Sequence, residues 1–182
     1  MTVADWVVVV DDDVSNLKMA GHILSQSNMR VSALKSGQAL LDFVRDNGSP
    51  DLILLDIKMP GMDGFETLEK LREQEKGKEE VPIIFLTADE SEDSETKGIS
   101  LGAMDFIKKP FVPDVLVTRV RHMIELIRLR RIIQTLVDAM KSHGDSRDVP
   151  LAESVREELE KGRGTQHDPG IVDIILAMID QG

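Results

Sequence analysis

The sequence predicts an α/β fold, in which a parallel β-sheet carries helices on both faces. Between residue 6 and about residue 110, short apolar runs alternate with amphipathic segments, as expected for strands joined by crossover helices. Several of these runs are apolar at every position, which is typical of strands covered on both faces. The chain has 182 residues, 41% of them hydrophobic and 30% charged, and this length allows one globular domain with an appendage.

Five apolar runs are predicted strands. They are Trp6 to Val10, Arg30 to Ala33, Leu52 to Leu55, Ile83 to Leu86, and Phe106 to Ile107 with its neighbours. The segments between them carry apolar residues at helical spacing and are predicted helices. These are Val14 to Ser27, Gly37 to Arg45, Phe65 to Gln74 and Glu92 to Ser100. Segments rich in glycine, proline or charge at 47–50, 60–64 and 75–80 are predicted loops.

The segment from Val112 to about Lys141 has no internal proline or glycine and predicts one extended last helix. A fifth helix covering the sheet needs only about half of this length. The remainder carries an apolar seam at alternating spacings of three and four, formed by Leu126, Leu129, Ile133, Leu136 and Met140. The seam favours a homodimer through this helix, and the alternative is that the extension packs back onto its own chain.

A polar segment at 143–150 is a predicted linker, and two short helices are predicted after it at 151–161 and 170–181. The last helix is too apolar to stand alone in water, so we expect it to pack on another segment. We therefore divide the chain into a main domain at 5–125 and a helical extension with a small helical tail at 126–182.

Charge and composition exclude several classes of function. The chain has 33 acidic and 22 basic residues, and its formal charge of −11 repels nucleic acid and anionic lipid. We expect no direct DNA binding and no membrane association. The absence of cysteine excludes disulfides and thiol chemistry. No apolar run approaches the ~18 residues that span a bilayer and no signal peptide is recognisable, so we expect a cytoplasmic protein.

Acidic side chains follow two of the predicted strands. Asp11, Asp12 and Asp13 come directly after the first strand, and Asp56 comes directly after the third. In a parallel sheet these positions share the carboxyl edge, where open α/β sheets bind ligands. Crowded carboxylates repel one another unless a cation neutralises them, and oxygen ligands suit Mg²⁺ or Mn²⁺. The alternative is a run of solvated acids that caps the next helix, a role open to Asp13 in particular.

The last two strands also end in polar residues. Thr87 ends the fourth strand, and Lys108, Lys109 and Pro110 follow the fifth. A lysine at this edge can pair with phosphate oxygens or with a carboxylate. Because side chains alternate along a strand, only one of the two lysines faces any given direction.

Four segments together resemble the receiver domain of bacterial two-component response regulators. They are VVVVDDDVSN at 7–16, LILLDIKMPGMDG at 52–64, PIIFLTA at 82–88 and GAMDFIKKPF at 102–111. The resemblance covers about residues 5–125. It implies a doubly wound, flavodoxin-like sheet of five parallel strands in the order 2-1-3-4-5.

The resemblance also implies a role for each residue of the set. Asp56 would be the phosphoacceptor, supplied by a sensor histidine kinase or a phosphotransfer protein. The Mg²⁺ ligands would be Asp11, Asp12, Asp56 and the backbone carbonyl of Lys58. Thr87 and Lys109 would bind the phosphoryl oxygens.

Phe106 and the pair of Lys58 and Asp89 each have two alternative roles. Phe106 stands where many family members have tyrosine, and it is either a switch residue that rotates inward or a permanently buried core ring. Lys58 and Asp89 would flank the mouth of the site, where they either pair and tune the lifetime of the aspartyl phosphate or remain exposed loop charges.

The segment ELEKGRGTQHDPGIVDIIL at 158–176 resembles the closing stretch of HD-GYP cyclic-di-nucleotide phosphodiesterase domains. No GYP tripeptide occurs, and the tail is too short for the helical bundle that holds the metal ligands. We interpret it as a degenerate effector tail, the alternative being chance similarity of a capped apolar helix.

We therefore expect a response regulator that is not an enzyme, in which phosphorylation of Asp56 switches a protein interaction or dimerisation. One alternative is a receiver-fold scaffold that works without phosphorylation. Another is a phosphatase of the haloacid dehalogenase class, which expects an aspartate two residues after its nucleophile, where this chain has Lys58.

Overall fold

The computed structural model describes residues 4–77, 79–88, 92–145, 151–164 and 169–181. It divides into two compact units, one at Ala4–Ile124 and one that contains the chain from Glu125 onward. Of the helices that the structure describes, none is long and apolar enough to cross a lipid bilayer.

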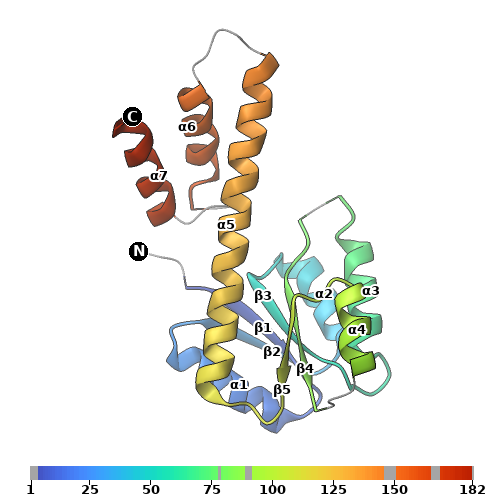
Figure 1. Ribbon diagram of the computed structural model, residues 1–182. Coiled ribbons are helices and arrows are strands. Elements are labelled where there is room, and N and C mark those ends of the chain that lie inside the picture. The colour runs from blue at the N-terminus through green and yellow to red at the C-terminus, as the bar shows by residue number, and fades with distance from the viewer. Residues whose placement is uncertain (1–3, 78, 89–91, 146–150, 165–168, 182) are drawn as a thin grey trace. The chain divides into compact units, whose positions relative to one another are not determined.

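The first unit is built on the five-stranded parallel sheet that the sequence predicts (Figure 1). Its strands are β1 (Trp6–Val10), β2 (Arg30–Leu34), β3 (Leu52–Asp56), β4 (Ile83–Thr87) and β5 (Asp105–Lys108). They lie in the order β2-β1-β3-β4-β5, with every neighbouring pair parallel. The expected doubly wound, flavodoxin-like order is therefore confirmed.

Four crossover helices and the first part of a longer helix cover this sheet. The helices are α1 (Val14–Gln26), α2 (Gly37–Asn47), α3 (Gly64–Gln74), α4 (Glu92–Ser100) and α5 (Pro113–Asp145). Asp13 caps α1, where its side chain accepts a hydrogen bond from the Ser15 amide at 2.7 Å. Asp63 caps α3 through the Glu66 amide at 2.8 Å. Both caps pair an exposed helix amide with a carboxylate and fix where the helix starts.

Hydrophobic cores lie on both faces of the sheet, which explains the runs of consecutive apolar residues. On one face, α1 and the first part of α5 pack against the odd-numbered valines of β1. On the other face, α2 and α3 pack against Val8 and Val10 (Figure 1). Side chains therefore alternate between the two cores, and this alternation decides the direction in which each residue at a strand end points.

The second unit contains the rest of α5 together with α6 (Leu151–Gly162) and α7 (Pro169–Gln181). Its core consists of Val155, Leu159, Val172 and Leu176, with Leu136 and Ile175 packed against them. The apolar α7 thus buries part of its surface against α6, as expected for a helix that cannot stand alone in water.

The residues of the predicted α5 seam do not share one environment. Leu126, Leu129 and Ile133 are exposed, whereas Leu136 is half-buried against the core of the second unit. The side chain of Met140 lies outside the described residues. One part of the seam therefore packs onto its own chain, and another part faces solvent.

Candidate functional site

The site lies at the carboxyl edge of the sheet, where strand ends bring together the charged residues that the sequence singled out. Asp11 follows β1 directly, Asp56 is the last residue of β3, and Lys109 follows β5. Because side chains alternate along a strand, all three point to the face of the sheet that α1 and α5 cover. Asp11 is fully buried, Asp56 is buried, and the Lys109 side chain is 14% exposed.

Lys109 bridges the two buried carboxylates. Its Nζ lies 2.7 Å from Oδ2 of Asp11 and 2.7 Å from Oδ1 of Asp56. Lys108, one residue earlier, is exposed. The Lys109 amide also donates a 2.8 Å hydrogen bond to the carbonyl of Thr87, which continues the strand ladder past the end of β4. The backbone thereby holds the lysine stem where its ammonium reaches both acids.

Burial and charge act in opposite directions on these groups. Burial raises the pKa of the Asp56 carboxyl, and the charges of Asp11 and Asp12 add to this rise, while Lys109 opposes it. Burial lowers the pKa of the Lys109 ammonium, but its close contacts with the Asp11 and Asp56 carboxylates outweigh burial, and the net pKa is raised. Lys109 is therefore firmly protonated, and Asp56 carries its charge at a cost.

Asp11 is oriented by the start of α1. Its Oδ1 accepts hydrogen bonds from the Asp13 amide at 2.9 Å and from the side-chain amide of Asn16 at 3.2 Å. Its buried Oδ2 contacts Lys109 and, within the described part of the chain, accepts no well-directed hydrogen bond. The carboxylate is thus fixed with one oxygen left for a cation.

Asp11, Asp12 and Asp56 form a group that fits a divalent ion. Each offers a carboxylate oxygen, and these oxygens lie within 4.8 Å of one another. Asp12 is exposed, whereas the other two are buried, so the group opens toward solvent on one side. Because all donors are oxygens and Asp11 Oδ2 lacks a directed partner, the residues suit a hard cation such as Mg²⁺ or Mn²⁺.

Thr87 and Phe106 approach this edge from the opposite face of the sheet. Thr87 is buried at the end of β4. It lies two residues after Phe85 and therefore points to the same face of the sheet, which α2 and α3 cover. The half-buried Phe106 ring packs on Phe85 with ring centroids 5.7 Å apart. It also lies against Gly98 of α4, where an added Cβ would be 2.6 Å from Phe106 Cζ. The ring therefore occupies space that glycine leaves open.

A second glycine shapes the site more closely than sequence reasoning suggested. The sequence shows only that Gly64 closes the predicted loop at 60–64. A Cβ at this position would lie 2.3 Å from the carbonyl oxygen of Asp56 and 2.9 Å from Cα of Ile57. The Gly64 amide donates a 2.9 Å hydrogen bond to the Ile57 carbonyl. The loop thus folds back onto the backbone of β3, which requires a residue without a side chain.

The residues assigned to the mouth of the site are only partly described. Lys58 is exposed and takes part in an interaction, and Met59, beside it, is buried. Asp89 lies outside the described residues. The lifetime-tuning pair of Lys58 and Asp89 therefore stays a prediction, as does the role of the Lys58 carbonyl as a metal ligand.

Comparison with known proteins gives one consistent result. A family model described as the response regulator receiver domain matches residues 7–121. The DNA-binding response regulator MtrA of Mycobacterium tuberculosis is 38% identical over 130 residues, which make up 71% of this chain and 53% of that protein. The chain thus spans about half the length of the curated relatives it matches.

Solved structures agree with the family match. NtrX from Brucella abortus has a TM-score of 0.67 and 27% identity, covering 74% of this chain and 30% of that chain. The chemotaxis protein CheY4 of Vibrio cholerae has a TM-score of 0.62 and 29% identity, covering 66% and 99%. A BeF3-activated DrrB receiver domain has a TM-score of 0.58 and 32% identity, covering 68% and 99%.

Proposed function

Because the chain belongs to the family of response regulator receiver domains, we propose that it is a response regulator which accepts a phosphoryl group on Asp56. The observation that carries this proposal is the Lys109 ammonium, held between the buried carboxylates of Asp11 and Asp56 at 2.7 Å from each. An ion pair that only stabilises the fold needs one acid for each lysine. Two acids on one lysine, beside a third acid at a ligand-binding sheet edge, are suited to phosphoryl transfer.

In this reaction the Asp56 carboxylate is the nucleophile. One of its oxygens forms a bond to phosphorus as the bond between phosphorus and the donor's histidine nitrogen breaks, and the nitrogen keeps that electron pair. Lys109 moves from the carboxylates toward the new phosphoryl oxygens and stabilises their charge. The Thr87 hydroxyl donates to another of these oxygens.

Asp11, Asp12 and Asp56 would hold Mg²⁺ or Mn²⁺ in this site. A bound divalent ion neutralises the charge that gathers on the phosphoryl oxygens. The chain's own contribution is positional, because the Asn16 and Asp13 hydrogen bonds fix Asp11 before any ligand arrives.

The donor is a sensor histidine kinase or a phosphotransfer protein, and the output is a protein contact or dimerisation. The relative MtrA is named as DNA-binding. In this chain, the described residues after 125 belong to the second part of α5 and to α6 and α7, and the net charge of −11 opposes nucleic acid. The degenerate HD-GYP-like tail remains our interpretation of these helices. We propose no enzymatic output.

A first experiment tests the chemistry. The purified protein is incubated with Mg²⁺ and acetyl phosphate, and intact mass is measured for the wild type, Asp56→Asn and the matched control Asp46→Asn, an exposed residue of α2. We expect a one-phosphoryl adduct in the wild type and the control that is lost in Asp56→Asn. A parallel titration with beryllofluoride measures binding without covalent chemistry.

The competing function is a receiver-fold scaffold that works without phosphorylation. It predicts no adduct and no saturable beryllofluoride binding in any of the three proteins. That outcome would refute the proposed phosphoacceptor and leave the fold as an interaction platform.

A further inference from the structure

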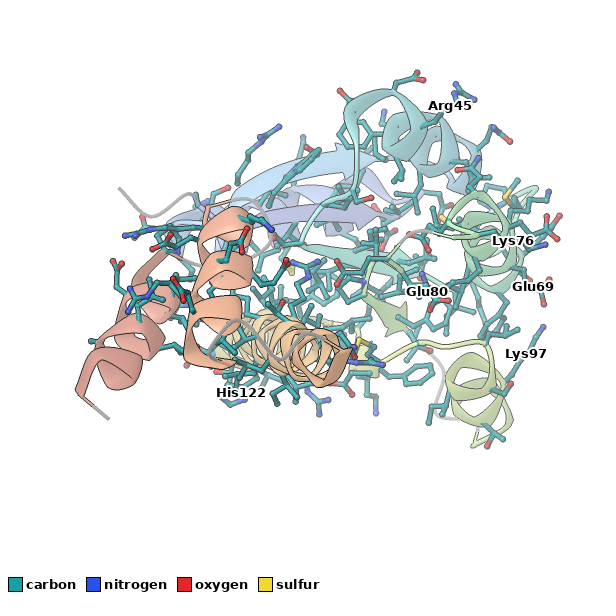
Figure 2. The ribbon with its side chains drawn as sticks, turned by 90° about the horizontal axis from the view of Figure 1, so that it is seen from above. Arg45, Glu69, Lys76, Glu80, Lys97 and His122 are labelled. Atoms are coloured by element: carbon teal, nitrogen blue, oxygen red, sulfur yellow. The ribbon has the colours of Figure 1, made fainter. Side chains whose placement is uncertain are left out.

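An apolar row on α5 is exposed in the second unit. Leu126, Leu129 and Ile133 follow one another at spacings of three and four, so they lie along one face of the helix. Their exposed fractions are 55%, 55% and 60%. We call these three residues the α5 stripe. The preceding turn of the same face carries His122, which Figure 2 shows projecting from the side of α5 turned away from the sheet.

Charges of opposite sign border the stripe. Glu125 lies on one side of it and Arg130 on the other, and both are exposed. With Leu126 and Leu129 at the a and d positions of a heptad, Glu125 takes a g position and Arg130 the e position that follows. These are the positions that pair between the two helices of a coiled coil.

We propose that the α5 stripe binds a second copy of this chain, as a parallel and in-register helix pair. In that arrangement each g position faces the next e position of the other helix. Glu125 of one copy then faces Arg130 of the other, and the two-fold axis makes this pair twice. In an antiparallel pair the g positions face each other, so that Glu125 and Arg130 find no such partners.

The chain itself explains where the stripe ends. Leu136, at the next d position, is half-buried against the α6 and α7 core. The described part of the chain therefore covers Leu136 and leaves the three preceding seam positions exposed. An interface of about one and a half heptads is short, so we expect a weak dimer with a dissociation constant on the order of micromolar or higher.

This inference rests on the proposed function for its consequence only, since the dimer would be the contact that phosphorylation of Asp56 strengthens or weakens. The two proposals fail separately. Phosphoryl transfer is read from intact mass, whereas the dimer is read from sedimentation equilibrium of the full chain, with and without beryllofluoride.

Charge reversal tests the register. Arg130→Glu sets Glu125 against a glutamate, and Glu125→Arg sets two arginines against each other. We expect each to weaken the dimer roughly fivefold, because two exposed pairs are lost. The double exchange restores the wild-type dissociation constant. Lys76→Glu and Glu69→Arg are the matched controls, because these exposed residues of the α3 side project outward (Figure 2).

Cross-linking tests the orientation, since the chain has no cysteine of its own. Leu126→Cys and Ile133→Cys replace exposed side chains, so neither substitution disturbs a core. In a parallel pair each variant forms a disulfide with its own kind, and a mixture forms none between the two kinds. In an antiparallel pair the mixture forms the mixed disulfide.

Several results would overturn the proposal. One is a monomer at every accessible concentration in both phosphorylation states. Another is a dimer that Leu129→Asp leaves unchanged, because this substitution should weaken a stripe-mediated dimer by roughly a hundredfold or more. A third is a mixed disulfide between Leu126→Cys and Ile133→Cys. A dimer that ignores all stripe variants forms through another surface.

Discussion

Removing the Lys109 ammonium should destabilise the protein strongly, and Lys109→Met tests this with little change in side-chain length. The variant leaves Asp11 fully buried and Asp56 buried without the cation that lies 2.7 Å from both. Breaking a buried ion pair by removing one partner costs about 3–5 kcal/mol. We expect about 3 kcal/mol here, since Lys109 is itself 14% exposed and its own burial is relieved.

The pH dependence has a defined sign. The pKa of Lys109 is raised in the folded protein, so its stabilising charge is fully present below the unfolded pKa of about 10.4 and is lost only at higher pH. At neutral pH the full effect of the substitution is therefore seen. Without Lys109, the pKa of Asp56 rises further, so protonation of this carboxyl reduces the loss as the pH falls.

Urea denaturation at pH 7 with and without Mg²⁺ is the assay. Lys108→Met is the matched control, because it removes the adjacent, exposed lysine. Mg²⁺ should stabilise Lys109→Met more than the wild type, because the divalent ion no longer competes with an ammonium for the same oxygens. Equal losses for the two variants, or equal stabilisation by Mg²⁺ of variant and wild type, would refute the assignment of Lys109 as the counter-ion of the site.

Three other substitutions follow from the same geometry, each measured by urea denaturation. Asp56→Asn should stabilise the protein at neutral pH, because burial raises the pKa of this carboxyl; the gain should shrink as the pH falls through that pKa, and a constant gain would contradict it. Gly64→Ala should lower the free energy of unfolding by about 2–3 kcal/mol, because its Cβ would meet the Asp56 carbonyl at 2.3 Å. Gly21→Ala should raise the free energy of unfolding by about 0.5–1 kcal/mol, because Gly21 lies inside α1 and its added Cβ would meet nothing within 4 Å. Gly98→Ala should displace the Phe106 ring at a cost of about 1–3 kcal/mol, and Phe106→Leu should reduce that cost in a double-mutant cycle; additive effects would show that the two do not touch.

The fold can be predicted from the sequence because burial on both faces of the sheet requires runs of consecutive apolar residues. Val7 to Val10 are apolar without a break because each residue enters one of two cores. The polar residue at the end of a strand interrupts the apolar run, so the pattern does not show that it still belongs to the strand. The apolar runs that predict these strands end at Leu55 and Leu86, and Asp56 is predicted to follow its strand, whereas β3 includes Asp56 and β4 includes Thr87. Backbone pairing extends through these residues although their side chains belong to the site.

Other features of the site depend on distances that a linear pattern does not contain. The turn residues at 60–64 predicted a loop, but nothing local shows that Gly64 returns to within contact of the Asp56 carbonyl. Strand alternation left open which of Lys108 and Lys109 faces the acids, because β5 is short and its end is not marked by apolar residues. The α5 seam allowed packing onto its own chain as an alternative, but the pattern does not show that Leu136 is the residue that meets α6 and α7, because their positions depend on tertiary packing.

The charge of the site favours a divalent cation before any phosphoryl group arrives. Asp11, Asp12 and Asp56 oppose a single ammonium from Lys109, so the cluster keeps an excess of two negative charges. In the proposed function, phosphorylation would replace the Asp56 carboxylate with a group of greater negative charge. The single positive charge of Lys109 cannot offset the negative charge of the acidic cluster and of the phosphoryl group together. The low polarity of a buried site strengthens the repulsion between these negative groups. Asp11, Asp12 and Asp56 would hold a divalent ion that supplies the missing positive charge, and Lys109 would then pair with the phosphoryl oxygens. We therefore expect phosphoryl transfer to depend on the metal more steeply than the stability of the fold does.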